Sequence, residues 1–318
     1  MAADSKYTRF RSYMLEDKGG SYSYFDGNLF TLIEARLNNA NRQNLNDEMA
    51  LCGVSKIHCL HITSWDSDHC KHSELEEILG SFKPRKIEYP GYEPHTDNGE
   101  KCLETIFKYQ NENLRQRNKK ITAISITPSY IKSLDKARAL KYSDVVYNPL
   151  EIDTKNANNR STVKIFRTGS FNVLSLGDVE SENIASYLRE LSTIKNEVDV
   201  MIMAHHGADN GFTTSAFLKK VKPLVAVVGS NFANQYDHPK QEIRDILYQE
   251  GIKLCTTKTG DVVIYSIKTN TGEFRVDNYI AKGQIINSTK DFIAKKRELL
   301  KHSPDTLTAK LKYSKRIY

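Results

Sequence analysis

Short apolar runs alternate with segments of helical spacing along most of the chain. Apolar runs rich in β-branched and aromatic residues predict strands, and apolar residues three and four positions apart predict helices. The predicted strands are residues 29–34, 57–63, 121–126, 163–167, 171–176, 198–204, 224–229, 253–256, 262–267 and 273–278. The predicted helices are residues 74–80, 99–117, 180–191, 215–221 and 239–248. This alternation predicts an α/β protein with helices packed outside its sheets.

The end of one predicted strand carries an unusual concentration of polar side chains. Asp66, Asp68 and His69 directly follow the apolar run 57–63. On a loop, where side chains do not alternate between two faces, these three can converge on one point. Carboxylate and imidazole together suit Zn²⁺, Mn²⁺ or Fe, and such an ion makes hydroxide from water near neutral pH. The alternative is an acidic cap of the following helix, in which Asp68 accepts backbone N–H bonds.

Three later strands end in the same way. One runs into Gly177-Asp178, the next into His205-His206, and a third is followed by a loop carrying His238. A Gly-Asp pair alone is typical of an ordinary turn. Two adjacent imidazoles at the end of a buried strand are more specific, and they make His238 a candidate ligand or general acid.

With these motifs in this order, the chain resembles the metallo-β-lactamase-fold hydrolases. Within them it looks most like the hydrolase domain of ComEC-type DNA-uptake (competence) proteins. Residues 63–69 fit that group's motif Ser/Thr-His-x-Asp-x-Asp-His, and Asn158-Asn159-Arg160-Ser161 fits its Asn-x-x-Ser motif. Gly-Asp, His-His-Gly and His-Pro complete the order, and the match spans residues 21–267. The resemblance implies an αββα four-layer metallo-β-lactamase sandwich with its site at the strand ends.

The resemblance also implies ligand sets. One metal site would take Asp68, His69, Asp178 and one of His205 or His206. The other would have Asp66 and a share of Asp178, but Ser64 stands where the family has its first histidine. Two carboxylates and a hydroxyl suit Mn²⁺ or Mg²⁺ better than zinc, so we expect one or two divalent ions, zinc or manganese. The expected catalytic residues are Asp68, which helps to hold the ion and its hydroxide, and His238, which protonates the leaving oxygen or steadies the phosphate.

Composition narrows the class of protein. Of the 318 residues, 39% are hydrophobic, which is enough for a real core. No apolar run is long enough to span a bilayer, and the polar first residues lack the apolar centre of a signal peptide. The five cysteines are odd in number and form no Cys-x-x-Cys pair, which is typical of reduced thiols. We therefore expect a cytoplasmic protein with no membrane contact.

Positive charge is concentrated at the end of the chain. Residues 290–318 hold nine basic and three acidic residues, which accounts for six of the seven net charges. We expect a hydrolase domain over residues 1–288 and a basic helical tail over 289–318, with Phe292, Ile293, Leu299 and Leu300 close to one helical face. The tail would either pack on the body or contact nucleic-acid phosphates. The candidate contacts are Lys295, Lys296, Arg297, Lys312, Lys315 and Arg316.

The leading functional hypothesis is a metal-dependent phosphodiesterase or nuclease that acts on nucleic acid, DNA in particular, beside possible partner subunits. The first alternative is a hydrolase of a small ester, lactam or cyclic nucleotide on the same fold, since one fold hosts many chemistries. The second is a binding or assembly subunit with weakened catalysis, for which Ser64 is the argument.

Overall fold

Two β-sheets form the centre of the protein, seen in a computed structural model that describes residues 7–115, 121–138, 140–152, 155–267, 272–280, 285–299 and 301. The larger sheet has nine strands within these residues. In order across the sheet they are β15 (Ile285–Ile293), β14 (Glu273–Ile280), β13 (Val262–Ser266), β1 (Arg9–Ser12), β2 (Tyr22–Phe25), β3 (Phe30–Ile33), β4 (Cys59–His61), β5 (Lys86–Pro90) and β6 (Thr122–Ile126). The strands β3 to β6 run parallel to one another, and the others pair antiparallel.

The second sheet has six strands among the described residues. In order they are β12 (Lys253–Thr256), β11 (Val225–Val228), β10 (Val200–Ile202), β9 (Val173–Ser175), β8 (Val163–Phe166) and β7 (Val145–Asn148). The strands β9 to β12 are parallel. Each sheet therefore contains a parallel set whose carboxyl ends share one edge, and such edges are where α/β proteins bind ligands.

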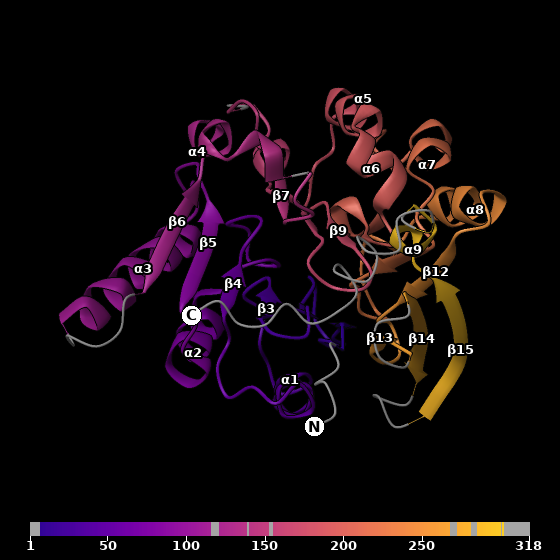
Figure 1. The fold of residues 1–318 in the computed structure, drawn as a ribbon. Coiled ribbons are helices and arrows are strands. Elements are labelled where there is room, and N and C mark those ends of the chain that lie inside the picture. Colours follow the sequence, from indigo (N-terminus) through magenta and orange to yellow (C-terminus); the bar gives the residue numbers. More distant parts are fainter. Residues whose placement is uncertain are drawn as a thin grey trace.

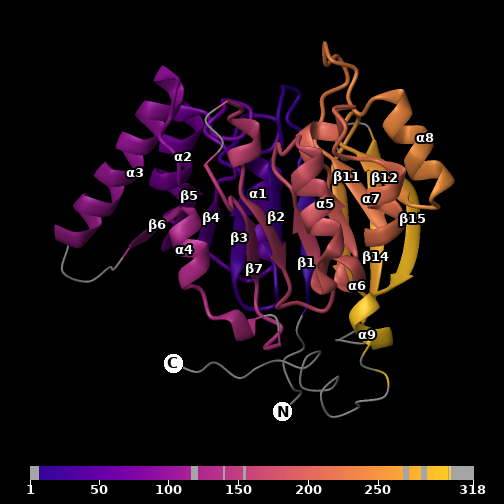
Figure 2. The ribbon, with the colours of Figure 1, turned by 90° about the horizontal axis from the view of Figure 1, so that it is seen from above.

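The helices lie on the two outer sides of this pair of sheets (Figures 1 and 2). On the side of the nine-stranded sheet are α1 (Arg42–Leu51), α2 (His72–Phe82) and α3 (Asp97–Arg115), and the short α4 (Pro128–Ser133) follows β6. On the side of the six-stranded sheet are α5 (Glu182–Glu190), α6 (Ser192–Glu197), α7 (Ser215–Val221) and α8 (Gln241–Gln249), with α9 (Lys295–Leu299) at its lower end. No described helix is both long enough and apolar enough to cross a membrane.

Three clusters of buried side chains fill the spaces between these layers. One joins α1, α2 and α3 to the nine-stranded sheet, and another joins α5 to α8 to the six-stranded sheet. The third lies between the sheets, with side chains of β1 to β3 on one side and β9 to β11 on the other. Along β10, Val200 and Ile202 belong to this inner cluster and Met201 to the outer one, because side chains alternate between the faces of a strand. The predicted αββα sandwich is confirmed.

The region around residue 289 differs from the helical tail expected from the sequence. Phe292 and Ile293 lie in β15, which pairs antiparallel with β14, so the expected boundary between residues 288 and 289 falls inside a strand. Helix begins only at Lys295. Phe292 packs against Phe274 with ring centroids 5.5 Å apart, and this contact with β14 outweighs the local helical spacing. Leu300, Lys312, Lys315 and Arg316 lie outside the described residues.

Candidate metal centre

Three loops converge where the parallel strands of the two sheets end. Asp68 and His69 lie between β4 and α2, Asp178 follows β9, and His206 follows β10. Gly177 has φ +57°, and a Cβ there would come within 2.9 Å of the Ser161 Cβ. Only glycine tolerates both the left-handed backbone and this approach, so the Gly-Asp pair serves to deliver Asp178 to the site.

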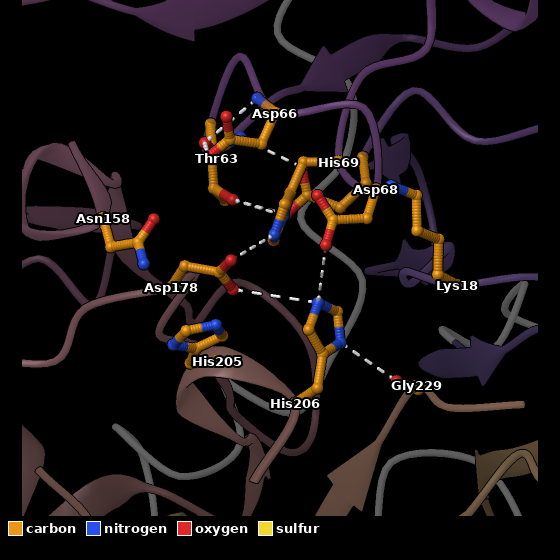
Figure 3. A network of polar contacts seen from close by, with 12 residues as sticks. Lys18, Thr63, Asp66, Asp68, His69, Asn158, Asp178, His205, His206 and Gly229 are labelled. Carbon is orange, nitrogen blue, oxygen red and sulfur yellow. Dashed lines mark hydrogen bonds and ion pairs between the residues drawn. The ribbon is translucent and has the colours of Figure 1, made fainter. Parts of the chain in front are cut away.

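Four side chains meet at this point, as Figure 3 shows. Asp68, His69, Asp178 and His206, hereafter the His–Asp cluster, each offer one ligand atom, and these atoms lie within 4.8 Å of one another. His69 and Asp178 are buried, whereas Asp68 and His206 are half-buried and open the cluster to one side. Two imidazoles and two carboxylates are a donor set that suits Zn²⁺, Mn²⁺ or Fe.

His69 and Asp178 form the tightest pair in the His–Asp cluster. The Nε2 of His69 lies 2.8 Å from the Oδ2 of Asp178. Burial opposes charge on the imidazole, but Asp178 and Glu34 outweigh it and raise the pKa of His69 well above its usual value. Burial likewise opposes charge on Asp178, yet His69, His206 and His205 lower the pKa of this carboxyl. The pair thus holds a proton at the place that a bound cation would take.

The cluster passes a test for holding a metal ion. The Oδ1 of Asp178 and the Nε2 of His206 are buried and have no hydrogen-bond partner among the described residues. They lie 3.8 Å apart, too far for a hydrogen bond. Two ligands bonded at about 2.1 Å to one tetrahedral ion lie about 3.4 Å apart. The unpaired atoms therefore have nearly the spacing that a shared cation requires, and a cation would offset the cost of burying them without a partner.

The two adjacent histidines point in different directions. His205 (φ 45°) and His206 (φ 52°) both have a left-handed backbone conformation, which is uncommon for residues other than glycine. The Nδ1–H of His206 donates to the Gly229 carbonyl at 3.0 Å, which leaves Nε2 facing the cluster. His205 instead places Nδ1 2.6 Å from Glu180 Oε1. Among the two imidazoles that the sequence offered, His206 is the one inside the His–Asp cluster.

Two residues absent from the sequence-based site support His69 from behind. Glu34 Oε1 lies 3.2 Å from His69 Nδ1 and accepts a hydrogen bond from the Thr63 hydroxyl at 2.6 Å. Glu34 is buried and left-handed (φ 68°), just after β3. A carboxylate on the far nitrogen of a ligating histidine fixes the ring and increases its basicity. The sequence signal for Glu34 was an acidic residue at the end of an apolar strand. Glu34 lies about 30 positions before the motif that contains His69, so the sequence alone does not connect the two.

Ser64 and Asp66 lie beside the cluster rather than in it. The Ser64 hydroxyl is 3.2 Å from Asp66 Oδ2 and 3.2 Å from the Tyr92 hydroxyl. Asp66 also uses its backbone carbonyl, which accepts from the N–H groups of His69 and Cys70 at 2.9 and 2.8 Å. Asp66 is therefore part of the loop that shapes the site, and it is not among the four residues whose ligand atoms lie together.

His238 lies next to the cluster, on the far side of His205. Its ring meets the His205 ring edge-on, with centroids 6.0 Å apart, and stacks on Tyr236 at 5.6 Å. Burial, followed by the neighbouring His206 and His205, lowers the pKa of His238 to about 4. The imidazole is thus neutral at pH 7, a state that suits hydrogen bonding to a phosphate better than full protonation of a leaving group.

The basic residues at the start of the tail are bound to the body. Lys296 is buried, and its Nζ donates to the carbonyls of Arg167 and Gly169 at 2.7 Å each. The Nζ of Lys295 donates to the Val221 carbonyl at 2.9 Å, and Arg297 pairs with Glu273 at 2.6 Å. The charged groups of all three residues therefore bind protein oxygens. These contacts favour the alternative in which this segment packs on the body over the one in which it contacts nucleic-acid phosphates.

Comparisons with known proteins agree with the resemblance seen in the sequence. No family model matches the chain. Over 227 residues, 70% of the chain, it is 24% identical to ComE operon protein 3 of Bacillus subtilis (strain 168), of which it spans 26%. Over 109 residues, 34% of the chain, it is 29% identical to competence protein ComA of Neisseria gonorrhoeae, of which it spans 16%. The chain thus spans about a quarter or less of these curated relatives.

A solved structure of the metallo-β-lactamase fold protein YhfI from Bacillus subtilis also matches. The TM-score is 0.43 and the identity 13%, with 79% of this chain and 97% of that one covered. The expected similarity to competence proteins and to metallo-β-lactamase-fold proteins is confirmed.

Proposed function

We propose that the protein is a divalent-metal-dependent phosphodiesterase that cleaves nucleic acid, DNA in particular, at the His–Asp cluster. The observation that carries the proposal is the convergence of four ligand atoms within 4.8 Å, beside which the buried Asp178 Oδ1 and His206 Nε2 have no hydrogen-bond partner among the described residues. A bound divalent cation would supply Lewis-acid chemistry and lower the pKa of water from about 15.7 to about 7.

The residues of the chain have separable tasks in this proposal. Asp68, His69, Asp178 and His206 hold the cation, with Glu34 and the Gly229 carbonyl fixing the two imidazoles from behind. His238, neutral at pH 7, holds a phosphate oxygen of the substrate by a hydrogen bond. Nucleic acid is the proposed substrate because the relatives at 24% and 29% identity bear names that refer to competence.

The test combines metal content with hydrolysis. Purified protein is analysed for bound metal and then offered labelled single-stranded DNA, duplex DNA, RNA, a cyclic nucleotide and a simple ester in Mn²⁺, Mg²⁺ or Zn²⁺. We expect cleavage of a nucleic acid, and we expect Asp178→Asn to lower its rate by more than about 100-fold, because even residues behind a metal ligand are worth about 10- to 100-fold.

The matched control is Asp209→Asn, an exposed carboxylate three residues beyond His206 in the loop after β10 and outside the cluster. It should retain wild-type cleavage and metal content. Hydrolysis of the ester alone, or an Asp178→Asn variant as active as wild type, would contradict the proposal.

A further inference from the structure

Two exposed aromatic side chains lie on the loop whose first residue, Gly229, accepts a hydrogen bond from His206 of the His–Asp cluster. Phe232 is 77% exposed and Tyr236 is 59% exposed, and both lie on the loop between β11 and α8. This loop projects beyond the strand ends (Figure 2). An exposed phenyl ring gains nothing for folding, since its apolar surface stays in water. A pair of such rings beside a candidate active site therefore points to a ligand that covers them.

The loop that carries these rings has a defined shape. Asn234 accepts from the backbone N–H of His238 at 2.7 Å and donates to the carbonyls of Asn231 and His238 at 3.0 and 3.1 Å. The carbonyl of Gly229, at the start of the same loop, accepts a hydrogen bond from the His206 ring. The loop is thereby tied at one end to a residue of the His–Asp cluster, and the backbone that carries the two rings is held by these hydrogen bonds.

A row of rings leads from the loop to the cluster. The Tyr236 ring stacks on His238 with centroids 5.6 Å apart and an angle of 27°. His238 meets His205 edge-on at 6.0 Å, and His205 is the neighbour of His206. A chain of planar groups bound along this row would have one end at the cation site.

The charge around the loop favours an anionic ligand. Asp237 lies 3.2 Å from the Arg244 guanidinium and 3.7 Å from the Lys258 ammonium. Lys240 adds a third positive charge beside His238. Two cations share the one carboxylate of Asp237 and a third lies beside His238, a local surplus of positive charge that suits phosphates better than it suits an apolar protein surface.

We infer that Phe232 and Tyr236 form a platform on which unpaired bases of a single-stranded nucleic acid stack, with a phosphate of the same strand at the His–Asp cluster. The inference rests on the proposed function for the bond cleaved at the cluster. Every base has an aromatic face, so stacking tolerates any sequence. Bases in a duplex already stack on one another, and for this reason exposed rings discriminate in favour of single strands or frayed ends.

Binding to an uncleavable probe tests the platform without relying on catalysis. The full-length protein is titrated against a fluorescent 12-nucleotide phosphorothioate strand and against a phosphorothioate duplex of the same length, with fluorescence anisotropy as the readout. Phe232→Leu keeps an apolar side chain but removes the ring. It should weaken single-strand binding by about 5- to 150-fold, the effect of losing one stacked base, and Tyr236→Leu should act similarly. Phe232→Trp should keep wild-type affinity.

The matched control is Tyr248→Leu, an aromatic residue 86% exposed near the far end of α8. It should bind as wild type, which separates stacking at the loop from a general loss of surface aromatics. Unchanged binding by Phe232→Leu, or equal losses for duplex and single strand, would overturn the inference. So would a wild-type protein that binds neither probe, which would leave a protein partner as the ligand of the rings.

The two proposals fail separately. Ring-dependent binding of the single strand without cleavage in any metal leaves the platform standing and removes the proposed function. Cleavage of nucleic acid by Phe232→Leu and Tyr236→Leu at the wild-type rate and affinity removes the platform alone.

Discussion

Among the residues of the His–Asp cluster, His206 shows how narrowly the backbone selects a ligand. Its neighbour His205 has the same side chain, and both lie in left-handed backbone, yet only His206 reaches the cluster. A left-handed residue costs of the order of 1 kcal/mol or more and persists where surrounding contacts impose it. Here the Gly229 carbonyl and Glu180 each hold one ring, so the strained turn separates two adjacent imidazoles into two roles.

We expect the His–Asp cluster to bind one divalent cation tightly per chain. Asp68→Ala removes a carboxylate from the cluster and should weaken binding of Zn²⁺ or Mn²⁺ by at least about 10-fold. Ser64→Ala should change it less than about twofold, because a hydroxyl is a weak ligand and Ser64 is engaged with Asp66 and Tyr92. Equilibrium dialysis with elemental analysis measures both. Two tightly held ions per wild-type chain, or equal losses in the two variants, would contradict it.

The sequence could predict which side chains meet in the His–Asp cluster, but not the residues that support them. Asp68, Asp178 and the histidine pair each follow an apolar strand, and parallel strands bring such ends to one edge. Glu34 could not be assigned to His69, because their contact depends on β3 pairing with β4. Nor could the choice between His205 and His206 be made, since it depends on a turn that the spacing of residues does not encode.

The basic residues near the end of the chain show that composition alone does not distinguish a nucleic-acid-binding segment from a segment packed on the body. Consecutive lysines are typical of a phosphate-binding segment. A lysine can also donate hydrogen bonds to backbone carbonyls that have no partner within a helix or sheet. In α9 the ammonium of Lys296 satisfies two carbonyls in the turn between β8 and β9. The same residue type at Lys301 is exposed and pairs only weakly with Glu298, at 3.7 Å.

Lys296→Met should therefore reduce the free energy of unfolding by about 2–4 kcal/mol, since it leaves two buried carbonyls without a donor. Lys301→Met, its exposed control, should change this free energy by less than about 0.5 kcal/mol. Urea unfolding followed by circular dichroism measures both. A Lys296→Met protein that is as stable as wild type but binds DNA more weakly would instead favour the nucleic-acid interpretation of this segment.

Elements with a strong local pattern were predicted closely, and elements defined by distant pairing were not. The helix Ser215–Val221 and the strand Lys253–Thr256 have the predicted bounds. The strands Arg9–Ser12 and Lys86–Pro90 were not predicted, because each mixes charged and apolar residues over four or five positions. Their charged side chains are buried by ion pairs with residues far along the chain, as between Arg11 and Asp261 at 2.7 Å. Periodicity within a short window does not detect such partners.

On the scale of the whole molecule, a buried ionic group joins the two sheets. Glu88 of β5 in the nine-stranded sheet pairs with Lys164 of β8 in the six-stranded sheet at 2.8 Å. The same carboxylate accepts from His61 of β4 at 2.8 Å and also pairs with Lys86. Burial raises the pKa of Glu88, but Lys164, His61 and Lys86 outweigh burial and lower it well below the usual value. Both partners across the sheet interface thus stay charged at neutral pH.

Because of the Glu88–Lys164 pair, we expect the free energy of unfolding to depend on pH in the acidic range. Since the folded protein lowers the pKa of Glu88, the stabilisation is present above the unfolded pKa of about 4.3 and is lost as pH falls through the folded value. The free energy of unfolding should therefore decline below about pH 4.3, and Glu88→Gln should make that decline shallower. At pH 7 the same substitution should cost about 3–5 kcal/mol, because it leaves Lys164 buried beside a neutral partner.

Urea unfolding from pH 3 to pH 7 measures the effect, and Glu93→Gln, an exposed glutamate just beyond β5, is the matched control. The double variant Glu88→Gln/Lys164→Met should recover part of the loss at pH 7, since an apolar side chain removes from the interior a charge left with Asp144, at 3.8 Å, as its carboxylate partner. If Glu88→Gln declines with acid as steeply as wild type and Glu93→Gln, then carboxylates elsewhere control acid unfolding. The sheets would in that case be held together by the apolar core between them, in which Phe10, Phe171 and Val227 are fully buried.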